Sequence, residues 1–355
     1  MRIFLETLKK FAKVVKSSIE IGLQASENIY IDFQNQYFCF NNSVLQGKVK
    51  FAYEGEKPEN FFVLTSDFLS LCNSYDYLDI EIDGKKVIFK HEKNTFQLAQ
   101  YRQKYSEVDY KVSGEDIKLP ENFYDMLKKA QSFTSSDDPV CDGVYLRNNS
   151  MFSSTKLTFF EADLDLSCDK EIGLPNKLVK LLISMPDYED SHTLSSDDNK
   201  IRFSVLGEFE LLFAKNINLV FPIDLKSPEQ VKKYDHKTQI VFDRDVLLNT
   251  LKFFDSFVEN IKNTIIHLSI AENIIFTSQG DSLIKKMCPC ESFSDDLAGG
   301  SIKLSHSVFK DAVSALAHEK GKNYKVVVQL RTDMPSINIS LDADKSIHVV
   351  FKQYK

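Results

Sequence analysis

The sequence has no tryptophan, and it contains only 12 glycines and 9 prolines among its 355 residues. So few glycines argue against a nucleotide-binding protein, because such folds depend on Gly-rich phosphate loops. No apolar run approaches the roughly 20 residues that span a bilayer. The first 20 residues are typical of a Lys-rich amphipathic helix, not of a secretion signal. The composition therefore indicates a soluble, cytoplasmic protein without a membrane partner.

Cysteine is also sparse, with six residues at positions 39, 72, 141, 168, 288 and 290. Several lie in apolar, strand-like runs such as Phe38-Cys39-Phe40, which is typical of buried, reduced thiols. Cys288 and Cys290 form the one close pair, and no second Cys or His pair accompanies them. We therefore expect no metal site.

Catalytic signatures are missing as well. The chain has no Gly-Xaa-Ser-Xaa-Gly elbow, no phosphate-binding glycine loop and no His-Glu-Xaa-Xaa-His motif. Its seven histidines are dispersed without ligand spacing, and acidic pairs such as Asp137-Asp138 are typical of solvated turns. We expect a protein without enzymatic activity and without a cofactor.

What the sequence does contain is a repeated cassette: an apolar residue, a helix-starting residue, two mostly polar positions and the start of an apolar helical stripe. The cassette returns every 55 to 68 residues, at 64–68, 119–123, 174–178, 242–246 and 304–308. Thr65, Asp243 and Ser305 are predicted helix N-caps, and the other two cassettes carry Pro, which suits a first helical turn. A sixth helix opens the chain. This recurrence predicts a repeat architecture.

β-rich segments follow each predicted helix. Residues 77–82 alternate between apolar and polar, turn at Asp83-Gly84 and return at 87–89. Pairing the six half-repeats predicts an α+β fold of three similar units, at 1–114, 115–235 and 236–355. No low-complexity linker separates these units, so we expect a rigid connection, for which continuous sheets are one solution.

The charge of the chain is unevenly distributed. A net charge of −7 means that the average surface repels nucleic acid, so DNA binding requires a segregated basic face. The polar face of the first helix supplies one, and further lysines follow on later helices. The candidate DNA-binding residues are Lys9, Lys10, Lys13, Lys16, Lys128, Lys129, Lys177, Lys180, Lys252 and Lys262. Lys is also a good helix former on any solvated face, so for a single lysine that ordinary explanation is equally good.

These patterns resemble the bacterial-type DNA polymerase sliding clamps, the three-domain β-clamp family, in a divergent or phage-encoded form. The resemblance covers essentially the whole chain. It is carried by the cassettes at 174–178 and 242–251, by Phe221-Pro222 ahead of Leu225 and Pro228, and by the ending at 349–355.

The resemblance implies a head-to-tail homodimer of three-domain subunits, which forms a six-domain ring around double-stranded DNA. Helices would line the channel and sheets would form the outer wall, so that an acidic exterior coexists with Lys-bearing inner helices. Contacts of Lys with phosphates carry no base information, and they therefore allow sliding.

The resemblance also implies a cleft that captures short linear peptides of the polymerase and of the clamp loader. The matching apolar positions are Leu146, Leu164, Pro222, Leu225, Val349 and Phe351. Ordinary core packing explains each of them equally well. Where the family usually carries a Gly-His-Arg-Leu turn, this chain has Glu161-Ala162-Asp163-Leu164, so its peptide preference is expected to differ.

For the subunit interface, the resemblance indicates Phe257 and Val258, with Tyr105 of the first unit as a weaker counterpart. Two alternatives to a dimeric clamp stay open at this point. One is a non-enzymatic β-rich structural or interaction protein, such as a virion component, which leaves the regular helices unexplained. The other is the two-domain trimeric clamp type, against which the third predicted unit argues.

Overall fold

The computed structural model describes residues 1–4, 9, 12–17, 27–41, 44–101, 105–155, 158–168, 171–184, 192–205, 207–215, 238–257, 264–271, 273–278, 283–316, 323–330, 336–342 and 346–352. The chain divides into two compact units. Unit 1 comprises Met1–Tyr124 and Leu166–Leu219, and unit 2 comprises Asp125–Asp165 and Val220–Lys355. In the described part, no helix is long and apolar enough to cross a membrane.

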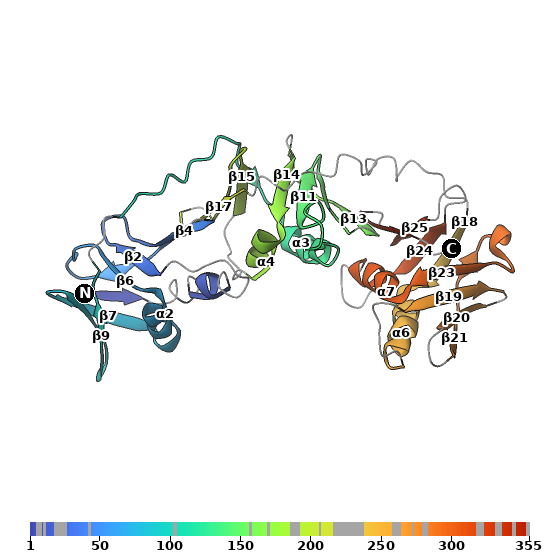
Figure 1. The fold of residues 1–355 in the computed structure, drawn as a ribbon, viewed down its shortest axis with the longest axis horizontal. Helices are drawn as coiled ribbons and strands as arrows, with labels where there is room; N and C mark the ends of the chain where they lie inside the picture. Colours follow the sequence, from blue (N-terminus) through green and yellow to red (C-terminus); the bar gives the residue numbers. More distant parts are fainter. Residues whose placement is uncertain are drawn as a thin grey trace. The chain divides into compact units, whose positions relative to one another are not determined.

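One plan recurs six times along the chain, namely a strand, a helix and three further strands (Figure 1). The first repeat contains β1 (Arg2–Phe4), helical residues 12–17, β2 (Asn28–Asp32), β3 (Tyr37–Asn41) and β4 (Leu45–Lys50). After the short β5 (Tyr53–Glu54), the second contains β6 (Phe61–Leu64), α2 (Thr65–Ser74), β7 (Tyr77–Asp83), β8 (Lys86–His91) and β9 (Asn94–Ala99).

The middle repeats follow the same order. The third contains β10 (Ile117–Lys118), α3 (Phe123–Gln131), β11 (Gly143–Arg147), β12 (Ser150–Ser154) and β13 (Thr158–Asp163). The fourth contains β14 (Ile172–Pro175), α4 (Asn176–Ser184), β15 (His192–Ser196), β16 (Lys200–Val205) and β17 (Phe209–Ala214).

The last two repeats belong to unit 2. The fifth contains β18 (Thr238–Asp243), α6 (Arg244–Asp255), β19 (Ile265–Ile270), β20 (Ile274–Ser278) and β21 (Ile284–Cys288), followed by β22 (Ser292–Phe293) and the 3-10 helix η2 (Asp295–Leu297). The sixth contains β23 (Ser301–Ser305), α7 (His306–Ala315), β24 (Lys325–Leu330), β25 (Ser336–Leu341) and β26 (Ile347–Lys352).

The predicted cassettes mark the junctions between strand and helix. Helices α2, α4, α6 and α7 each begin directly after a strand, whereas α3 begins at Phe123 after a short turn. The cap prediction is confirmed for Asp243, whose Oδ1 accepts from the Val246 N–H at 2.9 Å. It is wrong for Thr65, which is already the first helical residue. Ser305 does occupy the N-cap, but its Oγ bonds to Ser307 Oγ and makes no cap bond to the backbone.

Unit 1 contains two antiparallel sheets. Their orders are β5-β1-β7-β8-β9 and β10-β15-β16-β17-β4-β3-β2-β6. The first two repeats therefore exchange their first strands. β1 of the first repeat pairs with β7 of the second, and β6 of the second pairs with β2 of the first. Strands β17 and β4 pair over five residues, from Phe209↔Val49 to Phe213↔Leu45. A continuous sheet thus connects strands of the predicted segments 1–114 and 115–235.

Unit 2 repeats this arrangement. Its strands run in the orders β11-β12-β13-β26-β25-β24-β18-β22 and β21-β20-β19-β23. Here β13 pairs with β26, with Phe160 opposite Val349. A second continuous sheet therefore connects strands of the predicted segments 115–235 and 236–355.

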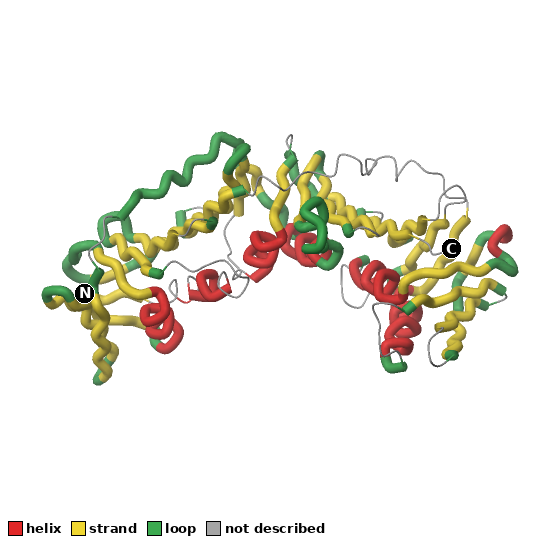
Figure 2. Tube along the Cα trace, in the orientation of Figure 1, coloured by secondary structure: helices red, strands yellow, loops and turns green. Residues whose placement is uncertain are grey.

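Phenylalanines at equivalent helix positions bind the helices to two sheets at once, and Figure 2 shows the helices in red against the yellow strands. Phe68, the fourth residue of α2, contacts Phe38 of β3 and Phe89 of β8, with centroids 5.6 and 5.8 Å away. Phe309, the fourth residue of α7, lies 6.0 Å from Phe351 of β26 and 6.5 Å from Phe276 of β20. Burying each such side chain contributes roughly 1.5–3 kcal/mol.

The thiol prediction is confirmed for five cysteines, which are buried and free, while Cys290 is half-buried. In the part of the chain that the structure describes, no cluster of three His, Cys, Asp or Glu side chains has the arrangement to hold a metal ion.

Candidate nucleic-acid interface and sheet edges

The first helix presents lysines on the face opposite its buried residues. Ala12, Val14 and Val15 are buried, while Lys13 and Lys16 are exposed. The Lys9 ammonium binds the Asp76 carboxylate, and this bond lowers the pKa of Asp76. Lys10 lies outside the described residues. Lys13 and Lys16 are thus exposed to solvent, and the Lys9 charge is partly compensated.

Helix α4 carries the clearest basic face. Leu178, Leu181 and Leu182 are buried on one side, and Lys177 and Lys180 are exposed on the other. No carboxylate within the described ranges forms an ion pair with either lysine. On α3, Lys128 is exposed. Lys129 pairs with Asp125 one turn earlier at 2.7 Å, which compensates its charge.

The other helices are less basic. Lys252 of α6 is exposed, and Lys310 of α7 bonds to both oxygens of Asp255, at 2.9 and 3.1 Å. Helix α2 contains no Lys or Arg. Lys262 lies outside the described residues. The basic charge is therefore concentrated on the first helix, α3 and α4.

Four of the predicted peptide-contacting residues lie in unit 2, and all four are buried. Leu146, Leu164, Val349 and Phe351 are at most 4% exposed. The strand register shows that Leu146, Val349 and Phe351 lie on the same face of the sheet β11-β12-β13-β26. This is the face on which Phe351 contacts Phe309 of α7. A peptide therefore reaches them only if side chains move aside. Pro222 and Leu225 lie outside the described residues.

The predicted interface residues lie in different surroundings. Phe257, just after α6, is 56% exposed, and its ring contacts Phe253 at 4.9 Å. Lys286 of β21 lies over that same Phe253 ring, 4.1 Å from the centroid, so Phe257 is close to the edge of a sheet. Tyr105 is half-buried and stacks on Tyr30. Val258 lies outside the described residues.

The sheet edges are a feature that the sequence interpretation missed. In four repeats the last strand takes part in a pairing between repeats, β4 with β17 and β13 with β26. In the second and fifth repeats the last strands, β9 and β21, end their sheets, and no described strand pairs with their outer edges. No local signal in the sequence identifies these two edges, because the periodicity of a strand does not name its partner.

The outer edge of β9 is well defined. His91 and Asn94 face each other across a two-residue turn, and the Gln100 N–H donates to the Lys85 carbonyl at 2.9 Å. Because N–H directions alternate along a strand, the N–H groups of Thr95, Gln97 and Ala99 face outward. An edge of this kind is a template for pairing with another chain.

Apolar side chains flank the other edge, β21. Leu283 is 65% exposed and Met287 is 59% exposed. Met287 lies directly opposite Ile275 of β20, so the two form an apolar pair on the sheet surface. With Phe257 nearby, this edge combines unpaired backbone with apolar surface, which is typical of an interaction site.

Sequence comparisons give no relative, since no protein-family model matches the chain and no curated protein matches it. Solved structures do match, over 100% of this chain. The DNA polymerase sliding clamp of Bacillus subtilis is 14% identical, with a TM-score of 0.79 and 98% of its own chain covered. The DNA polymerase III subunit beta of Pseudomonas aeruginosa is 14% identical, with a TM-score of 0.81 and 99% covered. The subunit from Thermotoga maritima is 12% identical, with a TM-score of 0.79 and 99% covered. The chain therefore has, over its full length, the α+β fold of the bacterial DNA polymerase III β sliding clamps.

Proposed function

We propose that this chain is a DNA sliding clamp, in which two copies associate head to tail as a ring around duplex DNA and hold a polymerase on it. The observation that carries the proposal is that no described strand pairs with the outer edges of β9 and β21, whereas the other four last strands are paired on both sides. Each copy offers one β9 edge and one β21 edge. In a closed head-to-tail dimer, β9 of each copy can pair with β21 of the other, so that all four edges are paired.

The domain boundaries follow from the same logic. We infer three domains, at 1–114, 115–235 and 236–355, each built from two consecutive repeats. The paired strands β4–β17 and β13–β26 then connect successive domains within one chain. A pairing of β9 with β21 of a second copy would supply the missing connection, giving six domains in the ring.

DNA binding in this proposal depends on the helix lysines. Lys13, Lys16, Lys128, Lys177 and Lys180 are exposed, and phosphate contacts from such side chains hold a duplex without reading its bases. An acidic surface elsewhere keeps non-specific binding weak. The protein then needs no catalytic group, and its work is done in the cytoplasm of a bacterium or a phage-infected host.

Partner capture is the remaining part of the proposal. We infer that peptides of the polymerase and the clamp loader bind beside Leu146, Leu164, Val349 and Phe351. Replacing Phe351 with Leu keeps most of the buried volume, so it should cost less than about 1.5 kcal/mol of stability. It should nevertheless weaken binding of a polymerase tail peptide, measured by fluorescence anisotropy. Unchanged affinity in the folded variant would remove Phe351 from the cleft.

The proposal as a whole is tested by topology. After loading onto nicked circular plasmid, a closed ring should stay bound in high salt, and it should be lost when the plasmid is cut once. An ordinary phosphate-binding protein would dissociate from both forms in high salt, because its contacts are screened. Equal retention on circular and linear DNA would contradict encirclement and favour an interaction protein.

A further inference from the structure

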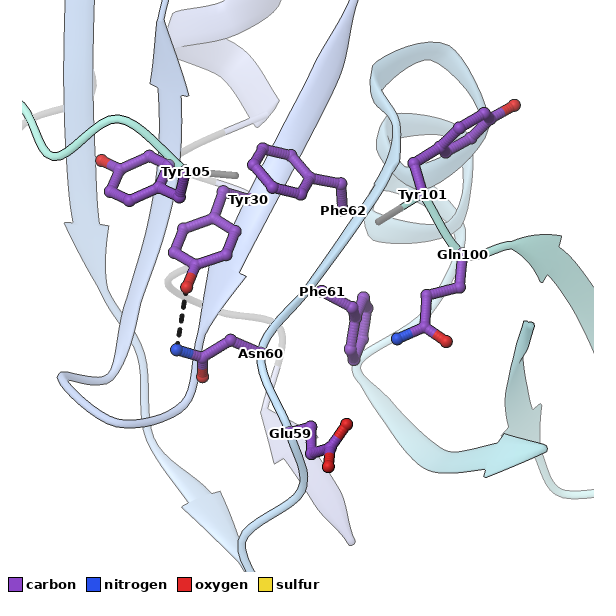
Figure 3. Close-up of a pocket in the computed structure, with 8 residues that line it drawn as sticks. All are labelled: Tyr30, Glu59, Asn60, Phe61, Phe62, Gln100, Tyr101 and Tyr105. Atoms are coloured by element: carbon purple, nitrogen blue, oxygen red, sulfur yellow. Dashed lines mark hydrogen bonds between the residues drawn. The ribbon is translucent and has the colours of Figure 1, made fainter. Parts of the chain in front are cut away.

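A pocket of about 300 Å³ opens in unit 1, beside the edge strand β6 (Figure 3). It is lined by Tyr30, Glu59, Asn60, Phe61, Phe62, Gln100, Tyr101 and Tyr105. None of these residues belongs to the lysine set or to the predicted peptide cleft, while Tyr105 is one of the residues predicted for the subunit interface. Its volume is at the lower limit of common ligand sites, which suits one side chain better than a whole cofactor.

The aromatic wall of the pocket is ordered by specific contacts. Tyr105 stacks on Tyr30 with ring centroids 4.1 Å apart and an interplanar angle of 10°. Phe62 lies against Tyr30 at 4.7 Å. Burial raises the pKa of both tyrosines, so their hydroxyls are neutral at pH 7. The rings thus offer uncharged π surfaces in a fixed arrangement.

Asn60 holds this wall in place. Its Oδ1 accepts from the Phe33 N–H at 2.8 Å, and its Nδ2 donates to the Tyr30 hydroxyl at 2.9 Å and to Asp32 Oδ1 at 3.0 Å. The Asn60 amide is therefore occupied, and it serves to position Tyr30.

The Gln100 amide and the Glu59 carboxylate are two further polar groups that offer acceptor oxygens to a ligand. Gln100 Oε1 is buried and has no hydrogen-bond partner, and the Glu59 carboxylate is exposed. Figure 3 shows Gln100 beside Phe61, and Glu59 at one end of the group. None of the lining residues that the structure describes carries a positive charge. An apolar ligand would leave Gln100 Oε1 without a partner, whereas a ligand with an N–H or O–H donor would supply the missing hydrogen bond. A ligand with several donors and a positive charge is favoured instead.

The pocket also adjoins a strand edge. β6 is the last strand of its sheet, and among the described residues its outer side pairs only at Phe62, whose carbonyl accepts from the Tyr101 N–H at 3.1 Å. An extended segment of another protein can continue along such an edge and place one side chain in the neighbouring pocket.

We propose that this pocket binds the guanidinium group of an arginine that a partner protein presents on an extended segment. A guanidinium has five N–H donors and no acceptor, and its flat face stacks on aromatic rings. Those properties match the Gln100 and Glu59 acceptors and the Tyr30–Phe62 wall. Lysine fits less well, because its ammonium is compact and strongly hydrated. The site is built from residues of unit 1 alone.

The test uses the full-length protein and three blocked tripeptides, Gly-Xaa-Gly, with arginine, lysine or neutral citrulline in the middle. Binding is followed by NMR of ¹³C-labelled tyrosine rings, with Tyr30, Tyr101 and Tyr105 assigned through single Tyr→Phe variants. The arginine peptide should shift these three rings and bind about tenfold tighter than citrulline, because a cation over aromatic rings beside a carboxylate gains that much. Equal affinity for arginine and citrulline would overturn the proposal, as would shifts confined to other tyrosines.

Matched variants show which polar groups of the pocket contact the arginine. Glu59→Gln and Gln100→Leu should each weaken the arginine peptide severalfold, whereas Glu56→Gln, in an exposed position of the same segment, should not. Equal effects of Glu59→Gln and Glu56→Gln would show that only general charge matters and would overturn the site. Blocked single arginine should bind more weakly than the tripeptide, and equal binding would overturn the part of the proposal that invokes the β6 edge.

Discussion

Among the described strands, the last strands of four repeats are paired on both sides and those of two repeats on one side only, although all six repeats follow the same plan. β4 and β17, like β13 and β26, are central strands of long sheets, whereas β9 and β21 end theirs. The paired strands are rich in buried side chains, while only one side of β9 is even half-buried. The difference teaches that one local plan supports two outcomes: its third strand becomes a central strand where another repeat of the chain pairs with it, and a sheet edge where no described strand does.

The largest expected effect comes from breaking a paired edge. Val350 of β26 pairs with Phe159 on one side and with Asn338 on the other. A Val350→Pro substitution removes an N–H from this ladder and leaves a buried carbonyl without its donor. The free energy of unfolding in urea should fall by roughly 1–3 kcal/mol. A Val350→Thr control keeps the N–H and should lose less. An unchanged midpoint for the proline variant would mean that the β13–β26 sheet does not hold unit 2 together.

A proline in the edge strand β9 should weaken assembly while leaving the stability of the chain almost unchanged. The N–H of Gln97 faces outward from β9, so Gln97→Pro should change the free energy of unfolding by less than about 1 kcal/mol. It should nevertheless lower the molar mass in light scattering toward that of a monomer, since the pairing with β21 loses a donor. Gln97→Ala, which keeps the N–H, should stay dimeric. A dimer with Gln97→Pro would exclude this edge from the interface.

A third prediction contrasts exposed lysines on helices with exposed lysines outside helices. Replacing Lys128, Lys177 and Lys180 with Gln should reduce the slope of log K against log salt by about 2.7, at about 0.9 for each phosphate contact. The matched triple change of Lys93, Lys111 and Lys118, all exposed outside helices, should leave the slope unchanged. Equal slopes for the two triple variants would remove α3 and α4 from the DNA interface.

The smallest expected effect concerns the cassettes. Asp243→Ala removes a cap bond to the Val246 N–H and should lower the free energy of unfolding by about 1 kcal/mol. Ser305→Ala, at the corresponding position before α7, makes no cap bond and should change it by less than about 0.5 kcal/mol. Chemical denaturation of the two variants side by side measures the contrast, and equal losses would show that the Asp243 cap contributes nothing.

Local features of this fold could be predicted from the sequence. The cassettes located the helix starts, because apolar spacing and strand-to-helix turns are encoded by neighbouring residues. The exchange of first strands between repeats, β1 to β7 and β6 to β2, could not be predicted. Such pairings join residues far apart in the chain, and the periodicity of a strand does not name its partner.

The candidate site divides in the same way. Exposure of Lys177 and Lys180 followed from the helical stripe, which buries Leu178, Leu181 and Leu182. The pairing of Lys129 with Asp125 could also have been predicted, because residues four apart on a helix lie next to each other. The stacking of Tyr105 on Tyr30, and the depth at which Leu146 and Phe351 are buried, depend on tertiary packing and left no local signal.

The molar mass in solution, measured by light scattering across a range of protein concentrations, tests the central claim most directly. The claim is that the free edges β9 and β21 close a two-copy ring. It predicts a mass near twice the 40.7 kDa of one chain, falling to one chain with Gln97→Pro. A strict monomer at every concentration, or a trimer, would contradict it.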